Sequence, residues 1–252
     1  MSKFLTALVL LGLCLLPATL HADTNVFEAW DGLLRKHVQV GHKQQIETAL
    51  VNYLRLGKEP KYKQLILDLP SVSTANLKTR NQKLAFWINV YNIAAVKMVV
   101  EHYPVKSIKD LGHLFQSVWD KPAVWIGGRM FSLGHIEHKI LRPLAEPRIH
   151  FAIVCASLSC PDLRAEAYFP DRLDAQLKEQ VTVFLRNSTK GFRRVNANKI
   201  EVSAIFNWFQ KDFDSVGGVT GFLEAGLGSP LGKTEIGYLP YNWSLNGLQS
   251  LR

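Results

Sequence analysis

The sequence predicts a mixed α+β fold, built as one compact domain with a central sheet flanked by helices. Three observations support this fold class. Apolar residues recur at helical spacing in several segments, most clearly over residues 82–102. Short apolar runs on either side of turn residues, as in 124–133, are typical of β-hairpins. Helices and strands also alternate irregularly along the chain, which favours α+β over a doubly wound parallel sheet.

The elements are expected in the following order. Residues 27–38 and 44–56 have amphipathic patterns and are predicted helices, and residues 57–62 end the second one. The long helix 82–102 has Leu84, Ile88 and Tyr91 on one apolar face and ends before Pro104. The segment 124–133 is a predicted hairpin with its turn at residues 127–129. Ser132 is the expected N-cap of a short helix over 133–142.

The second half of the chain begins with the run IHFAIV at residues 149–154, which predicts a buried central strand. An amphipathic helix is expected over 171–186, followed by a hairpin over 192–202 that turns at Asn196-Ala197-Asn198. Short helices are expected over 204–213 and 219–227, and a last strand over 238–243.

Residues 1–22 are expected to be a secretion signal that is removed on export. Lys3 precedes an apolar run over residues 4–16, and Ala22 is the small residue required before the cut. The run is short for a bilayer span, although an uncleaved anchor is the alternative that these residues leave open. We therefore expect residues 23–252 to form the mature, single-domain protein, periplasmic or secreted, with no transmembrane segment after signal cleavage.

The charge of the chain indicates little about its partner. The formal net charge is +9, but the basic residues are scattered, and groupings such as Arg35-Lys36 are only two residues long. A solvated basic surface explains this pattern better than a nucleic-acid interface, so no nucleic acid is expected. No phosphate-binding glycine loop, dinucleotide fingerprint or G-x-S-x-G elbow occurs, and no cofactor is expected. The expected partner is an unidentified substrate or a component of the cell envelope.

Cys155 and Cys160, in the run CASLSC, are the cysteines that remain once residues 1–22 are removed. In an oxidising compartment such a pair forms a disulfide by default. The alternative is that Cys155, at the end of the predicted buried strand, is a reactive thiolate. The residues alone leave both interpretations open.

A thiol nucleophile requires a base within hydrogen-bond reach and a group that orients the base. His138 is the candidate base for Cys155, and Glu137 or Asn89 is the candidate that orients it. The backbone N–H groups from Ser157 to Cys160 are expected to form an oxyanion pocket. In the alternative interpretation, His138 is an ordinary polar residue and Asn89 only ties down a neighbouring loop.

Two further polar patterns bear on the site. Asn92 lies three residues after Asn89 on an otherwise apolar helix, so it either lines the pocket or ties down a loop. His135 and His138 have a spacing that can bind metal, but no third ligand follows at a convincing spacing, so no metal is expected.

Four blocks of the chain resemble the domain of unknown function 547 family. They are KLAFWINVYN (83–92), SLGHIEHKILR (132–142), RIHFAIVCASLSCPDLR (148–164) and YLPYNWSLN (238–246). The resemblance covers the chain from about residue 50 onward. Its matching positions are Trp87, Asn89, Tyr91, Asn92, Glu137, His138, Arg142, Cys155, Cys160, Pro161, Trp243 and Asn246. Many bacterial relatives are exported single-domain proteins, in agreement with the expected signal.

The family has no established activity, so the resemblance implies a site rather than a reaction. Plant relatives often keep the first cysteine and carry serine at the second, which implies that a disulfide is not a general requirement and favours Cys155 as the functional thiol. Asn242 stands where relatives usually have aspartate. The complete set of expected pocket residues around the catalytic candidates is Asn92, Arg142, Ser157, Ser159 and Cys160.

These observations predict an exported cysteine-dependent hydrolase or acyl-transferase, with a fold and chemistry of papain or transglutaminase type. The competing hypothesis is a non-catalytic periplasmic binding or assembly protein, in which a Cys155–Cys160 disulfide holds a recognition loop.

Overall fold

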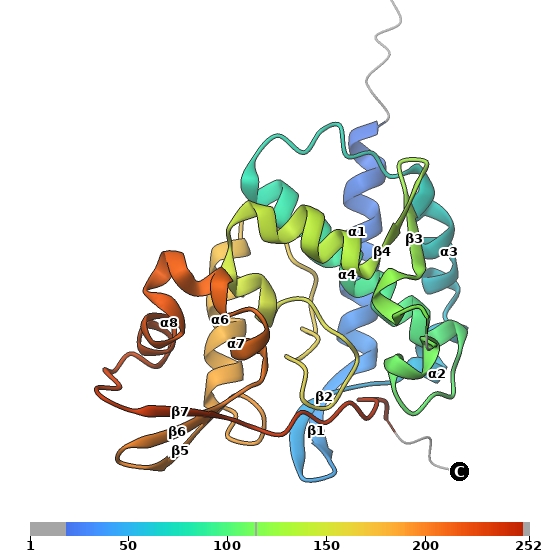
Figure 1. The fold of residues 1–252 in the computed structure, drawn as a ribbon. Helices are drawn as coiled ribbons and strands as arrows, with labels where there is room; N and C mark the ends of the chain where they lie inside the picture. The colour runs from blue at the N-terminus through green and yellow to red at the C-terminus, as the bar shows by residue number, and fades with distance from the viewer. Residues whose placement is uncertain (1–18, 114, 249–252) are drawn as a thin grey trace, which may run out of the picture.

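The structure, a computed structural model, describes residues 19–113 and 115–248 (Figure 1). Most of the expected signal peptide lies outside these residues, so the signal stays a prediction. The helices are α1 (Thr19–His37), α2 (Tyr53–Lys58), α3 (Pro60–Asp68), α4 (Arg80–Glu101), α5 (Leu133–His135), α6 (Leu173–Arg186), α7 (Ile205–Trp208) and α8 (Gly218–Leu227). The strands are β1 (Val38–Lys43), β2 (Ile46–Val51), β3 (Pro122–Ile126), β4 (Arg129–Ser132), β5 (Phe192–Asn196), β6 (Lys199–Val202) and β7 (Glu235–Tyr238).

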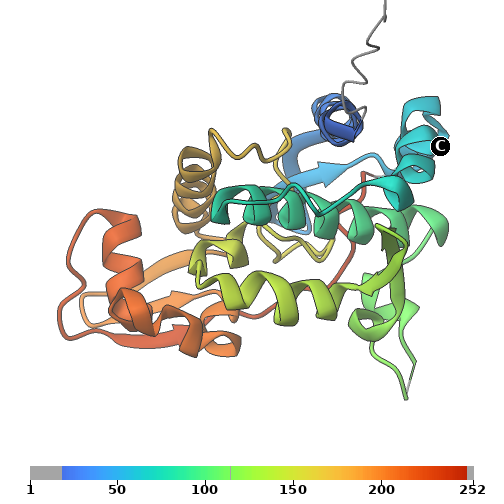
Figure 2. The same cartoon turned by 90° about the horizontal axis from the view of Figure 1, so that it is seen from above.

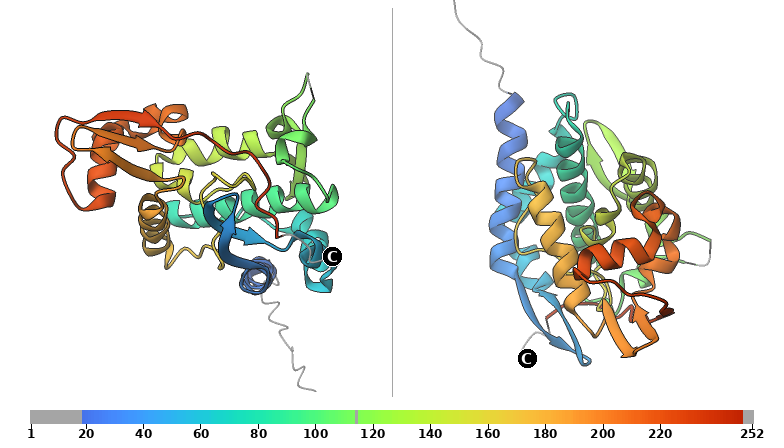
Figure 3. Two further views of the ribbon diagram at one scale, coloured as in Figure 1. Left: turned by 90° about the horizontal axis from the view of Figure 1, so that it is seen from below. Right: turned by 90° about the vertical axis from the view of Figure 1, so that its left-hand side faces the viewer.

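The mixed α+β class is confirmed, but in the described part of the chain the strands form three small sheets instead of a central one. Strands β1–β2 and β3–β4 are antiparallel hairpins, and β5–β6–β7 is a sheet in which β6 and β7 run parallel. The hairpins β1–β2 and β5–β6 lie at the same end of the molecule (Figures 1 and 3). Asn187 joins these two regions, since its side chain donates to the carbonyl oxygen of Glu47 over 2.8 Å.

Helix α4 is the core helix of the fold. It begins with a capping box, in which the Thr79 hydroxyl accepts from the Gln82 N–H and the Gln82 side chain accepts from the Thr79 N–H. Among the described residues it is the helix long and apolar enough to cross a membrane, yet 83% of that window is buried inside the protein. The helical segment that starts at α5 lies alongside it (Figure 2). This segment continues as a π-helical stretch, Ile136–Leu141 (η4), and a 3₁₀ turn, Arg142–Leu144 (η5).

The apolar core has two clusters. The larger surrounds α4 and includes Trp30 and Tyr91, and the smaller one gathers Phe151, Phe206 and Phe222 from the second half of the chain. The smaller cluster lies where α6, α8 and the three-stranded sheet meet, at the left in Figure 1. The candidate site lies where these two clusters adjoin.

The helix expected over residues 44–56 is wrong in its first part. Residues 46–51 form β2, which pairs with β1 in the register Val38↔Val51, and only the short α2 follows. The turn of this hairpin consists of Gln44 and Gln45, both at positive φ (50° and 63°). Glutamine is not a usual turn residue at positive φ, so the sequence carried no signal for this hairpin.

The central strand expected over residues 149–154 is also wrong. A 3₁₀ helix, Pro147–Phe151 (η6), occupies the first part of this run, and the rest is irregular. The run is buried as expected, but its backbone bonds to the Asn92 side chain instead of to neighbouring strands. A short apolar run does not distinguish a buried strand from another buried conformation.

The other expected elements occur with shifted ends. Helix 204–213 divides into α7 and a 3₁₀ segment, Gln210–Val216 (η7). The last strand was expected over 238–243, but β7 ends at Tyr238, the first residue of that range. The N-cap expected at Ser132 is confirmed, because its hydroxyl accepts from the His135 N–H over 3.1 Å.

Candidate functional site

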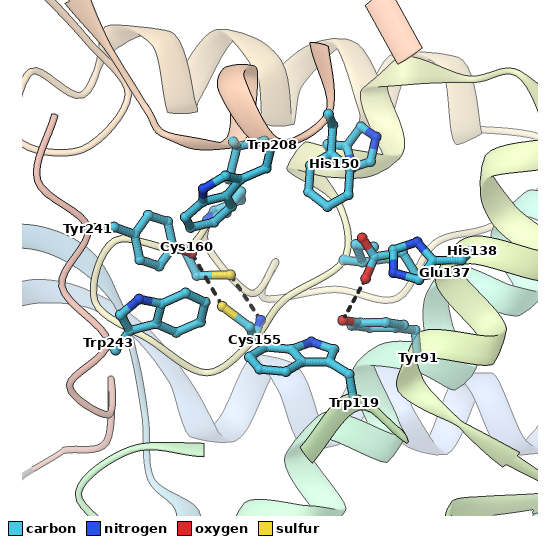
Figure 4. A pocket seen from close by; sticks show the side chains of 14 residues that line it. Tyr91, Trp119, Glu137, His138, His150, Cys155, Cys160, Trp208, Tyr241 and Trp243 are labelled. Carbon is cyan, nitrogen blue, oxygen red and sulfur yellow. Dashed lines mark hydrogen bonds between the residues drawn. The ribbon is translucent and has the colours of Figure 1, made fainter. Parts of the chain in front are cut away.

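A pocket of about 300 Å³ contains Cys155 in its wall (Figure 4). Six aromatic side chains line it and form what we call the aromatic wall: Tyr91, Trp119, Trp208, Phe209, Tyr241 and Trp243. The pocket-lining side chains that can carry chemistry are Cys155, Cys160, Glu137, His138 and His150. The structure therefore brings together Cys155, Cys160, Glu137 and His138, four of the residues expected from the sequence.

Asn92 on α4 holds the backbone that leads to Cys155. Its amide Nδ2 donates to the Ala152 carbonyl over 2.9 Å, and its Oδ1 accepts from the Val154 N–H over 3.0 Å. Asn92 is buried, and these bonds satisfy two backbone groups that have no strand partner. Asn92 thus holds the backbone that precedes Cys155 in place and does not line the pocket.

The segment 239–248 holds the other side of the cysteine loop. The N–H groups of Leu158 and Ser159 donate to the carbonyls of Ser244 and Asn242, and the Cys160 N–H donates to Ser157. The Ser159 hydroxyl accepts from the Asn242 N–H over 2.9 Å. These N–H groups are therefore not available for the oxyanion pocket that the sequence suggested, and Ser159 is a structural contact.

The sulfur of Cys155 is surrounded by hydrogen-bond donors. The Ser157 hydroxyl lies 3.1 Å from it and the Tyr241 hydroxyl 3.3 Å. Hydrogen bonding by the Cys160 thiol outweighs the opposing effect of burial and, with the contributions of Ser157 and Tyr241, lowers the pKa of Cys155 to about 7. Stabilisation of the charged form by hydrogen bonds is the expected cause of such a shift. At neutral pH a large fraction of Cys155 is thiolate.

Cys160 has the opposite character. It is buried, and its sulfur accepts from the Cys155 N–H over 2.9 Å. Burial, and then the hydrogen bond to Cys155, raises the pKa of the Cys160 thiol. Both cysteines are free thiols in the structure, so the disulfide considered from the sequence is not formed there.

Glu137 faces the same pocket from the π-helical stretch η4, a kind of segment that is frequent at functional sites. Its carboxyl is buried, and Oε2 accepts from the Tyr91 hydroxyl over 3.3 Å (Figure 4). Burial raises the pKa of Glu137 to about 7. Near neutral pH this carboxyl can therefore both release and accept a proton.

His138 lines the pocket but is not arranged as the base of Cys155. Arg142, which can only donate, lies 3.2 Å from its Nδ1, so the neutral ring carries its proton on Nε2. Burial and then the charge of Arg142 lower the pKa of His138. In the described part of the chain no hydrogen bond joins this ring to Cys155. The hydrogen bond of His138 is therefore to Arg142 rather than to Cys155, which differs from the pairing expected from the sequence.

Asp212 fixes this orientation and was missed by the sequence analysis. Arg142 contacts its two carboxylate oxygens over 2.6 and 2.7 Å, and Nε2 of His150 donates to Oδ2 over 2.8 Å. Although burial opposes it, hydrogen bonds from Arg142 and His150 lower the pKa of Asp212. Burial lowers the pKa of His150 to about 4, so this imidazole is neutral. Asp212 is 70 residues from Arg142, and no local pattern indicates their pairing.

Two other expected residues lie elsewhere. Both amide atoms of Asn89 bond to the backbone of Tyr168, over 2.8 and 2.9 Å, so Asn89 ties a loop to α4 and cannot orient a base. His135 packs against Phe131, with ring centroids 5.4 Å apart, and lines a different cavity from His138. The histidine pair therefore does not converge on a metal.

The aromatic wall is the largest part of the site that the sequence analysis missed. Trp208 stacks on Trp243 with ring centroids 5.7 Å apart, and Tyr241 lies 4.6 Å from Trp243. Trp119 meets Trp243 edge-on from the other side, at 5.7 Å. The dense run YNW at residues 241–243 is the local signal that could have indicated a binding surface.

Fold and site together define an α+β protein with a cysteine at the wall of an aromatic pocket. A family model described as "Protein of unknown function, DUF547" matches residues 74–185, so this segment of the chain is similar to that family. The matched segment contains α4, Glu137 and Cys155, whereas Asp212 and the aromatic run at 241–243 lie beyond it. Comparison with curated proteins and with solved structures finds no match.

Proposed function

We propose that this protein is a cysteine-dependent hydrolase or acyl-transferase with Cys155 as its nucleophile. The observation that carries the proposal is the environment of the Cys155 sulfur, which lies in a pocket wall among hydrogen-bond donors that favour the thiolate. A thiolate already present at neutral pH attacks without a dedicated base. The proposal therefore does not require the His138–Cys155 pair expected from the sequence.

Glu137 supplies the proton transfers in this proposal. The Cys155 thiolate attacks the carbonyl carbon of an ester, thioester or amide, forming a C–S bond. The bond to the leaving group then breaks, and that group takes the proton of the neutral Glu137 carboxyl. The resulting Glu137 carboxylate next accepts a proton from water or an acceptor nucleophile, which attacks the thioester and releases the Cys155 thiolate. A carboxyl with a pKa of about 7 suits both steps.

His138 is the proposed donor for the carbonyl oxygen. Its proton lies on Nε2 because Arg142 donates to Nδ1, and Asp212 holds Arg142 through two hydrogen bonds. A fixed donor of this kind stabilises negative charge that develops on a carbonyl oxygen. It takes the place of the backbone N–H groups from Leu158 to Cys160, which donate to backbone carbonyls of the protein.

The aromatic wall suits an acyl group with an apolar or planar part, since tryptophan and tyrosine rings offer large apolar surfaces. We also propose that the protein is exported through a signal peptide at residues 1–22 and acts on a component of the cell envelope. Sequencing the N-terminus of the mature protein tests the export step, because cleavage after Ala22 would leave Asp23 first.

The experiment that tests the reaction uses an activated ester, p-nitrophenyl acetate, with the reduced protein. We expect a burst of p-nitrophenol and an acetyl group on the tryptic peptide 149–164, which contains both cysteines. Cys155→Ser is expected to abolish the burst and the acetylated peptide while leaving the fold intact. An equal burst in Cys155→Ser would contradict the proposal.

The competing hypothesis of a non-catalytic binding protein depended on a Cys155–Cys160 disulfide. Both residues are free thiols in the structure, so no specific observation favours that hypothesis over acyl transfer. The acylation experiment also tests it, because a binding protein gives no Cys155-dependent burst.

A further inference from the structure

We propose that Cys155 and Cys160 form a redox-active dithiol that reduces small organic disulfides, with Cys155 as the attacking thiol and Cys160 as the resolving thiol. This activity goes beyond acyl transfer, since it depends on a second sulfur that acyl transfer does not use. Three features of the cysteine loop support it: the distance between the two residues, the conformation of the loop and the difference between the two thiols.

The two cysteines are close enough to bond. The Cys160 sulfur lies 2.9 Å from the backbone nitrogen of Cys155, and the N–Cα bond is about 1.46 Å long. The Cys160 sulfur is therefore within about 4.4 Å of the Cys155 Cα atom, which is within the reach of the Cys155 side chain.

The loop that joins them is folded back on itself. Ala156 is buried and has a φ of 57°, a conformation that is uncommon for a residue with a Cβ atom. The Cys160 N–H then closes a turn onto the Ser157 carbonyl over 3.2 Å. Backbone strain of this kind persists where the surrounding structure imposes it, and it is frequent at functional sites. Here its consequence is that residues five apart in the chain face each other.

The two thiols differ in the way that attack and resolution require. Cys155 is partly exposed in the pocket wall and favours the thiolate, whereas Cys160 is buried beside it and favours the neutral thiol. An incoming disulfide therefore meets Cys155 as the stronger nucleophile. Cys160 becomes the nearest sulfur to the mixed disulfide that follows.

The reaction proceeds in two exchanges. The Cys155 thiolate attacks one sulfur of the disulfide RSSR, the S–S bond breaks, and RS⁻ leaves with a mixed disulfide on Cys155. Cys160 then loses its proton to water and attacks the Cys155 sulfur, releasing a second RS⁻. The two protein sulfurs are oxidised to one disulfide, and RSSR is reduced to two thiols after the RS⁻ groups take up protons.

The test uses bis(2-hydroxyethyl) disulfide, which is small enough for the pocket, with reduced and desalted protein at neutral pH. Free thiols are alkylated after quenching, and the tryptic peptide 149–164 is analysed by mass. In the wild type we expect loss of both thiols from this peptide, an internal disulfide, and release of two molecules of 2-mercaptoethanol per protein.

Two variants assign the roles. Cys160→Ala is expected to stop at the mixed disulfide and release one molecule of 2-mercaptoethanol, and Cys155→Ala is expected to lose the fast reaction. A wild-type peptide that keeps a stable adduct on Cys155 beside a free Cys160 would overturn the proposal. If Cys160→Ala does not fold, the wild-type peptide alone decides between these outcomes.

This result is independent of the acyl-transfer test. Acylation is measured in the reduced protein, where no internal disulfide is present. A protein that is acylated but never forms the internal disulfide supports the proposed function and refutes the dithiol. A protein that forms the disulfide but is not acylated supports the dithiol and refutes the proposed acyl transfer.

Discussion

At the scale of single residues, the site depends on neighbouring groups that shift each other's pKa in opposite directions. Cys155 is half-buried and Cys160 is buried, and the pKa of Cys155 is lowered to about 7 whereas that of Cys160 is raised. The difference arises because hydrogen bonding by Cys160, and then by the hydroxyls of Ser157 and Tyr241, stabilises the charged form of Cys155, whereas burial and the hydrogen bond to Cys155 favour the neutral form of Cys160. Pairs whose pKa values are separated by their surroundings are typical of acid–base and nucleophilic sites.

Glu137 gives a prediction in which stability depends on pH. Burial raises its pKa to about 7, whereas the pKa of a glutamate in an unfolded chain is about 4.3. The folded protein therefore keeps a proton that the unfolded chain releases. This contribution to stability is complete below about pH 4.3 and is lost as the pH rises through about 7.

Glu137→Gln removes the ionisable carboxyl and therefore the loss of stability at high pH. We expect the variant to exceed the wild type in free energy of unfolding by about 2–3 kcal/mol at about pH 8, and to show little difference at about pH 4.5. Urea unfolding at the two pH values measures the effect. Glu47→Gln, a change at an exposed carboxyl, is the matched control and should follow the wild type. A Glu137→Gln variant that is less stable than the wild type at about pH 8 would show that the carboxyl is ionised and paired in the fold.

At the scale of elements, the pattern of the sequence was sufficient where local signals agree. The long helix had an apolar face and a following proline, and it occurs within two residues of its expected bounds. The hairpin at Gly127-Gly128 also has both glycines at positive φ, as its turn requires. The β1–β2 hairpin had no such turn residues and was therefore missed.

The candidate site divides in the same way. Cys155, Glu137 and His138 belong to dense polar or small-residue runs and line the pocket as expected, whereas Arg142, also expected there, contacts His138 and lines a different cavity. The contacts of Asp212 with Arg142 and His150, and the aromatic wall of the pocket, join segments that are distant in the chain, which periodicity and spacing do not report. The roles of Asn89 and His138 were wrong for the same reason, because their hydrogen-bond partners are set by the tertiary structure.

The side chain of Asn92 takes the place of the strand pairing that was expected at residues 149–154, so its removal should destabilise the fold. Asn92→Ala leaves the Ala152 carbonyl and the Val154 N–H buried without these partners. Each such group costs about 1–3 kcal/mol, so we expect the free energy of unfolding to fall by about 2–4 kcal/mol. Asn81→Ala, at an exposed position of the same helix, should change it by less than about 0.5 kcal/mol. Equal, small effects in both variants would mean that Asn92 does not hold the cysteine segment.

At the scale of the whole molecule, the pocket exists because two apolar clusters meet. The larger cluster supplies Tyr91 and Trp119, the smaller one supplies Phe209 and Tyr241, and the cysteine loop lies between them. The segment 239–248 crosses this boundary and bonds both to the cysteine loop and to β2. The geometry of the site is therefore expected to depend on both clusters.

Phe151 is the clearest test of the smaller cluster. Its ring stacks on Phe222 with centroids 5.3 Å apart and packs against Phe206 at 5.4 Å. Phe151→Ala is expected to lower the free energy of unfolding by about 3–5 kcal/mol. Phe115→Ala is the control, because this ring is 95% exposed and its removal should have almost no effect. The two are compared by urea unfolding, and similar losses would refute the packing described for Phe151.

The rate of iodoacetamide alkylation of Cys155 as a function of pH shows whether its thiol is an activated nucleophile. It is followed on the tryptic peptide 149–164 of the reduced protein. A nucleophilic thiolate at this site predicts that Cys155 reacts before Cys160, with a rate that rises through a midpoint at about pH 7. A midpoint at about 8.5, the value of an ordinary thiol, or faster alkylation of Cys160 would contradict the assignment of Cys155 as the nucleophile.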